Sequence, residues 1–297
     1  MKIGIPRAMY YYIEPKWLDF FNYLNIPIVL SEKTNNKIIR DGINIANDEL
    51  CLSMKIFMGH VNNLKGKCDC LFLPRIDNYG LYEQMCANYS GLYEIVKNQF
   101  EFNILDCNID YKNKKDEYNA FLEVGKKLNL NHKIIKKAYE YSTIINNKKI
   151  KKNHIISYNK LKSDKPKVLV VSHPYNVFDE YIGKPIIDYL SKECEVIISS
   201  NFDNRITNKL SDEICEDLYF KCSKDNAGSI SLCLPYIDGI LFITTFPCWL
   251  DSLVNEVIMR RIKKPYLNLI VDELSDNTGF ETRLESFVDI IRGIKNV

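Results

Sequence analysis

Apolar residues occur along the chain in short continuous runs that alternate with segments of helical spacing. Such runs are typical of strands buried on both faces of a parallel sheet, whereas apolar residues at every third or fourth position predict helices. The first region has predicted strands at 2–5, 26–30, 68–73 and 102–105, and helices at 9–24, 35–46 and in the segment that carries Cys51. The last region has predicted strands at 168–171, 195–199, 239–244 and 266–271, and helices at 211–219, 227–234, 250–262 and near the end of the sequence.

This pattern predicts an α/β protein with two Rossmann-like (flavodoxin-like) parallel-sheet lobes that face a central crevice. The segment between them is rich in Lys and Asn and has helical periodicity at 118–128 and 133–145. We therefore expect an N-terminal α/β lobe at 1–110, a helical connector at 111–165 and a C-terminal α/β lobe at 166–297. A length of 297 residues fits two domains of about 150 residues each.

The composition changes this picture little. Hydrophobic residues make up 46% and charged residues 26%, which is typical of a globular protein. With 40 basic and 38 acidic residues, the net charge of +2 gives no reason to expect nucleic acid as a partner. No apolar run approaches the roughly 20 residues that span a bilayer, and the N-terminal segment lacks a signal-peptide pattern. We expect a cytoplasmic protein that does not bind a membrane.

Ten cysteines would then be thiols or metal ligands rather than a disulfide framework. They lack the close spacing of zinc ribbons and ferredoxins, so a metal cluster would need ligands from distant segments. Cys51 follows Asp48, a plausible N-cap that would place the thiol near the positive end of a helix. The alternative for Cys51 is a buried structural cysteine. Most other cysteines fall on predicted strands and helices, where packing is the favoured role: Cys68, Cys70, Cys194, Cys215, Cys222 and Cys233.

Cys248 occupies the strongest ligand position on pattern alone, because it lies between a strand that ends at Thr244 and a helix that begins at Leu250. Its alternative is a capping or packed thiol beside Trp249. Cys86 lies in a polar segment, 82–93, which suits a loop or the start of a helix.

Further polar residues follow predicted strands, where open α/β sheets bind ligands. Arg75 is either an anion-binding residue or part of a surface salt bridge, and Lys55 would lie near it in the first lobe. A polar turn after the strand at 168–171 carries further candidates but lacks the glycine fingerprint of dinucleotide sites. These candidates are His173, Tyr175 and Asn176. A last group either pins the terminal helix to the sheet or forms a polar floor beneath the crevice: Asp272, Glu273 and Arg283.

Seven stretches occur in the order of a known family: IGIPRAMYYY, DELCLSMK, GHV, FLPRI, SHPYNVFDEYIGKP, TTFPCWLDSL and VDELSDNTGFETRLESFVD. They resemble the acyl-CoA dehydratase activase-related proteins (CoA-substrate-specific enzyme activase-related, of unknown function), distant relatives of the 2-hydroxyacyl-CoA dehydratase subunits. The resemblance covers both ends of the chain and leaves the middle uncovered. In the dehydratase relatives each subunit holds an iron–sulfur cluster through three cysteines, and the matching positions here are Cys51, Cys86 and Cys248.

The resemblance implies an iron–sulfur protein with one 4Fe-4S cluster. This cluster is either separate or part of a bridged cluster of higher nuclearity. It implies anaerobic chemistry, either low-potential electron transfer or the reduction or dehydration of an acyl-CoA-like substrate. The chain has no Walker pattern, so electrons would come from an ATP-hydrolysing activator or another donor protein, and a homo- or heterodimer is a further expectation. Whether the chain is by itself a lyase or a reductase component stays open. The alternatives are a cluster-free binding or scaffold module of an activase-type complex, and a zinc site formed by the same thiols.

Overall fold

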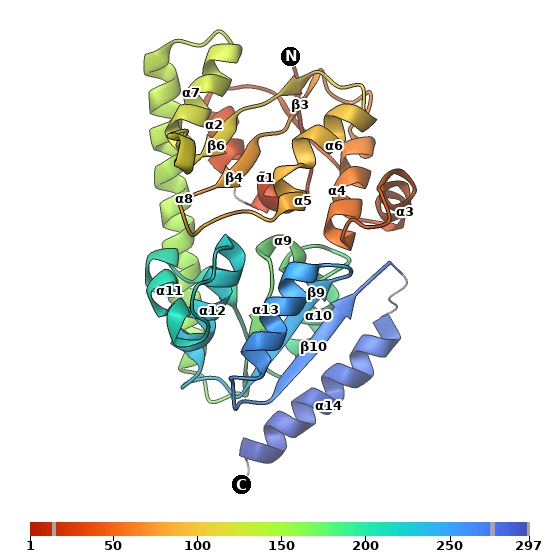
Figure 1. Ribbon diagram of the computed structural model, residues 1–297, viewed down its shortest axis with the longest axis vertical. Helices are drawn as coiled ribbons and strands as arrows, with labels where there is room; N and C mark the ends of the chain where they lie inside the picture. Colours follow the sequence, from red (N-terminus) through yellow and green to blue (C-terminus); the bar gives the residue numbers. More distant parts are fainter. Residues whose placement is uncertain (14–15, 274–276, 296–297) are drawn as a thin grey trace. The chain divides into compact units, whose positions relative to one another are not determined.

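The computed structural model describes residues 1–13, 16–273 and 277–295 and divides the chain into two compact units (Figure 1). The first unit comprises Met1–Lys149 and Tyr219–Lys221. The second comprises Ile150–Leu218 and Cys222–Val297. Each unit is described by itself below.

The first unit is built on a parallel sheet of four short strands in the order β2-β1-β3-β5. Its strands are β1 (Ile3–Ile5), β2 (Ile28–Leu30), β3 (Cys70–Phe72) and β5 (Ile104–Leu105). The side chains of β1 and β3 are buried, as their apolar sequences predict. A second, two-stranded parallel sheet pairs β4 (Arg75–Asn78) with β6 (Asn108–Asp110).

Helices surround these sheets. They are α1 (Met9–Ile13), α2 (Lys16–Tyr23), α3 (Asn36–Ile45), α4 (Leu52–Asn63), α5 (Ala87–Ser90), α6 (Leu92–Gln99), the 3₁₀ turn η1 (Tyr111–Asn113) and α7 (Glu117–Lys127). The long helix α8 (His132–Leu161) contains the boundary between the units. Trp17 stacks on Phe121 with ring centroids 3.7 Å apart and also contacts Phe72, so aromatic packing joins α2 and α7 to β3. Helices α3 and α4 approach so closely that a Cβ atom at Gly59 would lie 1.9 Å from the carbonyl oxygen of Ile38.

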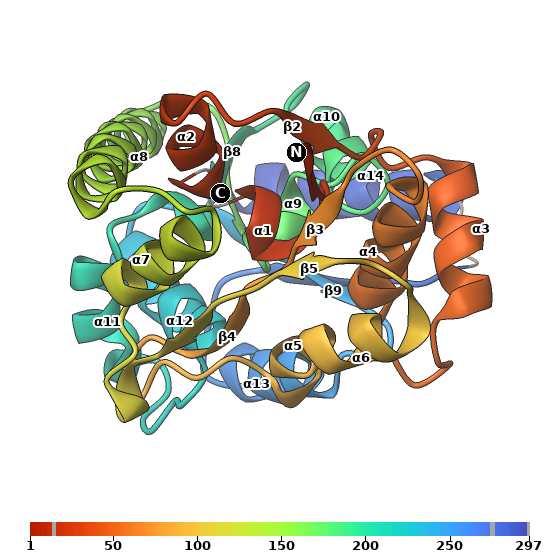
Figure 2. The same ribbon diagram turned by 90° about the horizontal axis from the view of Figure 1, so that it is seen from above.

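The second unit contains a parallel sheet in the order β10-β9-β7-β8. Its strands are β7 (Lys167–Val171), β8 (Glu195–Ile198), β9 (Gly239–Thr245) and β10 (Tyr266–Val271). Its helices are α9 (Pro174–Val177), α10 (Lys184–Leu190), α11 (Asn204–Leu210), α12 (Lys221–Cys233), α13 (Trp249–Met259) and α14 (Asn277–Lys295), with 3₁₀ turns η2 (Ser199–Asn201) and η3 (Ser211–Glu213). Helices α12 and α13 pack on one face of the sheet and α10 and α14 on the other (Figure 2). Every residue of β9 is buried, because helices cover both of its faces.

The prediction of an α/β protein with parallel sheets is confirmed, and each predicted strand overlaps an observed one. The predicted helix at 9–24 corresponds to α1 and α2, and residues 14–15 between them lie outside the described residues. The predicted helix at 211–219 is wrong beyond η3, since Asp217 adopts a left-handed φ of 56° that a helix does not allow. The crevice between two facing lobes stays a prediction. None of the described helices is long and apolar enough to cross a membrane.

Candidate functional site

The three cysteines predicted to hold a cluster each occupy the N-cap of a helix. Cys51 precedes α4, Cys86 precedes α5 and Cys248 precedes α13, and all three are half-buried. The backbone N–H groups of a first helical turn lack intrahelical partners and carry the positive end of the helix dipole. At Cys86 one of these groups is used directly, because the Tyr89 N–H donates to Sγ at 3.4 Å. Cys86 thus has a hydrogen-bond donor at its sulfur, whereas the sulfur of Cys248 hydrogen-bonds to the carboxylate of Asp251.

The prediction that Asp48 caps the Cys51 helix is wrong, since Cys51 itself is the N-cap of α4. A turn organised by Asn47 keeps the preceding residues outside the helix. Its side-chain oxygen accepts the Glu49 N–H at 3.1 Å, and its carbonyl oxygen accepts the Leu50 N–H at 3.0 Å. The Cys51 thiol consequently lies next to the first turn of α4 instead of within a longer helix.

In the second unit, an ion pair follows two neighbouring strands. His173 comes two residues after β7, and Asp251 lies in the first turn of α13 after β9. His173 Nε2 is 3.3 Å from Asp251 Oδ2, and the two side chains are only 12% and 10% exposed. Strand β7 pairs with β8 on one side and with β9 on the other. The chain order therefore reverses between β7 and β9, which is the position where open α/β sheets bind ligands.

Two cysteines join this ion pair. His173 forms a side-chain hydrogen bond with Cys222, and Asp251 forms one with Cys248. We call these four residues the His173 cluster. The sequence analysis identified His173 and Cys248 but assigned Cys222 to core packing, which is wrong because Cys222 is partly exposed and contacts an imidazole. Asp251 was missed, and its only sequence signal is a carboxylate three residues after a cysteine.

Neighbouring charges and hydrogen bonds affect the pKa values of His173 and Asp251 more than burial does. Burial lowers the pKa of His173, but the charges of Asp251 and Cys222 and the hydrogen bonds to both raise it well above its ordinary value. Burial in turn raises the pKa of Asp251, whereas the charge and hydrogen bond of His173 bring it below its ordinary value. The pair is therefore an imidazolium and a carboxylate near neutral pH.

The other predicted residues of the second unit divide into two groups. Tyr175 stacks on the ring of His173 with centroids 4.7 Å apart, and Asn176 is fully buried in α9, so both belong to the surroundings of the His173 cluster. Arg283 donates to the carbonyl oxygen of Asn268 at 2.7 Å and thus fixes α14 to β10. Asp272 and Glu273 directly follow β10, and the charge of Asp272 adds to burial in raising the pKa of Tyr181.

The two predicted cations of the first unit lie in different surroundings. Lys55 is 6% exposed on α4, one helical turn after Cys51. Arg75 follows the end of β3 as predicted and also begins the separate strand β4. It forms an ion pair with Glu94, and its guanidinium carbon lies 5.0 Å from the ring centre of Tyr93.

Several remaining cysteines are packed as predicted. Cys70, Cys194 and Cys233 are buried, and burial raises the pKa of Cys70 to about 11 and that of Cys233 to about 12. Cys68 donates to the Leu64 carbonyl oxygen at 3.6 Å and packs on Gly4. Such thiols stay protonated near neutral pH and serve as small apolar side chains.

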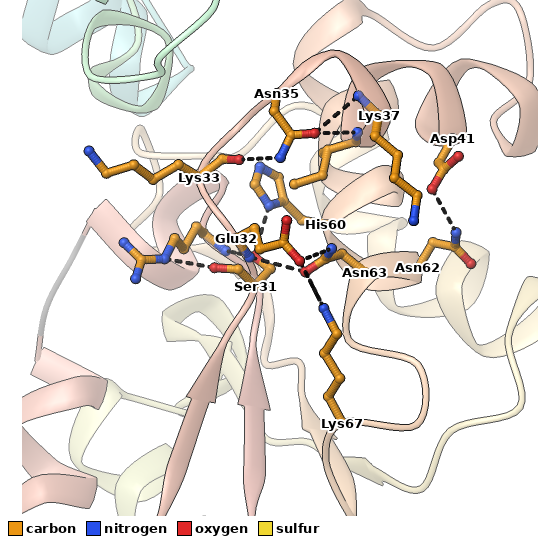
Figure 3. Close-up of polar contacts among 12 residues, drawn as sticks. Ser31, Glu32, Lys33, Asn35, Lys37, Asp41, His60, Asn62, Asn63 and Lys67 are labelled. Atoms are coloured by element: carbon orange, nitrogen blue, oxygen red, sulfur yellow. Dashed lines mark hydrogen bonds and ion pairs between the residues drawn. The ribbon is translucent and has the colours of Figure 1, made fainter.

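A buried polar network in the first unit surrounds His60 (Figure 3). Ser31 Oγ lies 2.8 Å from His60 Nδ1 and accepts the Arg7 backbone N–H at 2.8 Å. Thr34 Oγ1 lies 3.0 Å from His60 Nε2, so each ring nitrogen has a hydroxyl group as its hydrogen-bond partner. Burial, with a smaller contribution from the charge of Arg7, lowers the pKa of His60 to about 4. His60 is therefore neutral and ties the loop after β2 to α4.

Among the residues that the structure describes, no three His, Cys, Asp or Glu side chains form a group that could hold a metal ion. The predicted ligands Cys51 and Cys86 belong to the first unit and Cys248 to the second. Within the second unit, the hydrogen bonds of the His173 cluster join an imidazole and a carboxylate to two thiols.

A comparison with models of protein families identifies a match. The family model described as "CoA enzyme activase uncharacterised domain (DUF2229)" matches residues 2–202. This range includes Cys51, Cys86 and His173 and ends before Cys222. No curated protein matches the chain.

Proposed function

Because the matching model covers more than half of the chain, the chain belongs to this uncharacterised CoA enzyme activase family, and from this premise we propose that it is an iron–sulfur component of an activase-type system. In this proposal, the thiolates of Cys51, Cys86 and Cys248 bind one 4Fe-4S cluster. The protein passes low-potential electrons, or takes part in the reduction or dehydration of an acyl-CoA-like substrate, together with a partner enzyme.

The shared position of the three cysteines supports this proposal. Thiolates are the usual ligands of iron–sulfur clusters, and each of these three lies at a helix N-cap. Cluster potentials depend on hydrogen bonds to sulfur and on nearby charge, and Cys86 already accepts such a bond from Tyr89. The chemistry of the three cysteine ligands is therefore compatible with a 4Fe-4S cluster. Three protein ligands leave one iron of a four-iron cluster open to a substrate, a bridging atom or a partner, and the bound cluster supplies one-electron transfer.

Residues beside the ligands have roles that follow from their contacts. Asp251 accepts a hydrogen bond from the Cys248 thiol and is itself paired with His173, and metal binding would replace the proton of that thiol. Lys55 lies four positions after Cys51, a spacing that places both on one side of α4. A buried cation at this position would stabilise negative charge at the Cys51 sulfur.

The partners follow from the same premise. A family named for activation of CoA enzymes suggests that this chain works with an enzyme component. The electron source in this proposal is an ATP-hydrolysing activator or another donor protein, and the chain acts as a homodimer or as one subunit of a heterodimer.

A cluster-free binding or scaffold module of an activase-type complex is the second candidate. A zinc site made from the same thiols is a further alternative, since zinc also binds cysteine thiolates.

Anaerobic reconstitution with iron and sulfide tests these candidates. We expect a brown protein with a broad absorbance band at about 400 nm, and iron and acid-labile sulfide in equal amounts. Replacing Cys51, Cys86 or Cys248 by Ser should remove the iron, because a hard alkoxide is a poor substitute for a soft thiolate. The matched controls are Cys70→Ala and Cys233→Ala, which lie in the cores of the two units and should keep it.

Two results would decide against the cluster, and a third would decide against the assigned ligands. Colourless protein with stoichiometric zinc would identify a zinc site, and protein that takes up neither metal would favour the scaffold. Loss of iron in Cys70→Ala together with retention in Cys86→Ser would show that the ligand assignment is wrong.

A further inference from the structure

One face of α12 carries a line of polar side chains that ends at Cys222. Cys222, Asn226 and Ser229 are spaced at i, i+4 and i+7 and so lie on the same side of the helix. Asn226 is 7% exposed and Ser229 is fully buried. Polar side chains in such surroundings destabilise a protein unless they are hydrogen-bonded, and here each one is.

Two of these hydrogen bonds lead to the sulfur of Cys222. Ser199 Oγ donates to Asn226 Oδ1 at 2.6 Å, which fixes the amide of Asn226, and Asn226 Nδ2 donates to Cys222 Sγ at 3.5 Å. Ser229 Oγ lies 2.8 Å from two carbonyl oxygens, those of Ser199 and Asp225. A neutral thiol is a weak acceptor, whereas negative charge that develops on a sulfur during a reaction accepts strongly. The Asn226 amide is therefore placed to stabilise a sulfur that attacks as a nucleophile.

A charged group also contacts the same sulfur. His173 hydrogen-bonds with Cys222 and is held by Asp251 at 3.3 Å. A cysteine beside an imidazole that a carboxylate orients is the arrangement of nucleophilic thiols. Cys222 is partly exposed, so a reactant can reach it, and it lies in the first turn of a 13-residue helix. His173 follows β7, at the strand pair where an open α/β sheet binds its ligand.

We propose that Cys222 is a nucleophilic thiol that accepts an acyl group from a thioester, with His173 as its proton carrier and with Asp251 and Asn226 as positioning residues. The nucleophile is inferred from the contacts of the second unit alone. The choice of a CoA thioester as the acyl donor rests on the proposed function.

The step is an exchange of one thioester for another. Cys222 reacts as the thiolate while His173 holds the proton of its thiol. The sulfur attacks the carbonyl carbon of the acyl donor, a new carbon–sulfur bond forms, and the bond from that carbon to the sulfur of CoA breaks. The proton passes from His173 to the departing CoA thiolate. The products are S-acylated Cys222 and free CoA, with no net oxidation or reduction.

The matched control in the same unit is Cys215. It is also partly exposed, but its sulfur donates to the carbonyl oxygen of Glu216 and its side chain packs against the apolar core of the unit. We would treat the full chain with iodoacetamide at neutral pH and follow the labelling of both cysteines by peptide mass spectrometry. Cys222 should react about tenfold faster than Cys215, or more. Incubation with acetyl-CoA should place an acetyl group on Cys222 that hydroxylamine removes.

Variants then separate chemistry from folding, because Cys215 reports the state of the unit within each sample. His173→Gln should slow labelling of Cys222 about tenfold or more, with Cys215 unchanged. Asp251→Ala should lower the ratio of the two rates, and Asp251→Glu, which keeps the carboxylate, should restore part of it.

The proposal would be overturned by equal labelling of Cys222 and Cys215, by the absence of an acetyl group on Cys222, or by loss of iron from Cys222→Ala, which would make Cys222 a cluster ligand. Protein that binds no iron but acylates Cys222 would contradict the proposed cluster and leave this inference intact.

Discussion

The two units each bury a histidine close to the end of a parallel strand, and the two histidines differ in their partners. His60 meets the hydroxyl groups of Ser31 and Thr34, and burial, with a smaller contribution from the charge of Arg7, lowers its pKa to about 4. His173 meets Asp251 and Cys222, and its pKa rises although only 12% of its side chain is exposed. Burial alone therefore does not produce a charged site. The carboxylate decides whether a buried imidazole is a neutral structural group or a cation beside a thiol.

The comparison also implies opposite effects of pH on stability. For His60 the folded pKa lies below the ordinary value, so the unfolded chain binds more protons and stability falls as the pH drops from about 6.5 to about 4. For His173 the pKa in the folded protein lies above the ordinary value of a histidine. The stabilisation from His173 is fully present below about pH 6.5 and is lost as the pH rises through the folded pKa.

The largest effect should come from removing Asp251, the carboxylate that distinguishes the surroundings of His173 from those of His60. Asp251→Ala leaves a buried imidazole without its ion-pair partner, and breaking a buried pair in this way costs roughly 3 kcal/mol of unfolding free energy. The pKa of His173 should fall, and it should fall below its ordinary value when Cys222→Ala is added, because burial is then the main remaining influence. Urea unfolding and NMR titration of the histidine ring protons measure the two quantities. An unchanged pKa for His173 in the double variant would mean that another group sets its charge.

The next effect concerns His60 and acid stability. A pKa of about 4 against an ordinary value of 6.5 corresponds to roughly 3 kcal/mol of unfolding free energy lost on acidification, at 1.36 kcal/mol per pH unit. His60→Gln cannot take up a proton, so the difference in stability between this variant and the wild type should change over this pH range. Denaturant unfolding at pH 7, 5.5 and about 4 would measure it. Parallel curves for the two proteins would show that His60 does not titrate on folding.

Much of the fold was predictable because it depends on local patterns. The apolar runs located every strand of both main sheets, since a strand covered on both faces needs consecutive apolar residues. Cys248 was also located from pattern, because a strand followed directly by a helix fixes its place. The role of Cys222 was not predictable. Its partners His173 and Asn226 come from different elements, and only the pairing of β7 with β8 and β9 brings those elements together. The helix predicted at 211–219 also failed for a reason that composition does not encode, namely the left-handed φ angle of Asp217.

The smallest effect is expected for Arg75. This prediction tests whether a charged side chain of the first unit contributes to a functional site, as Asp251 does in the second unit. Its guanidinium is paired with Glu94 and lies over Tyr93, and both members of the ion pair are substantially exposed. Such pairs contribute about 0–1 kcal/mol, so Arg75→Ala should lower the thermal midpoint slightly and leave iron content, reduction potential and acyl-CoA binding unchanged. Glu94→Gln is the matched control, because it breaks the same pair and keeps the cation. If Arg75→Ala lowered the reduction potential or weakened acyl-CoA binding while Glu94→Gln did not, Arg75 would be an anion-binding residue, and a charged site would exist in the first unit as well.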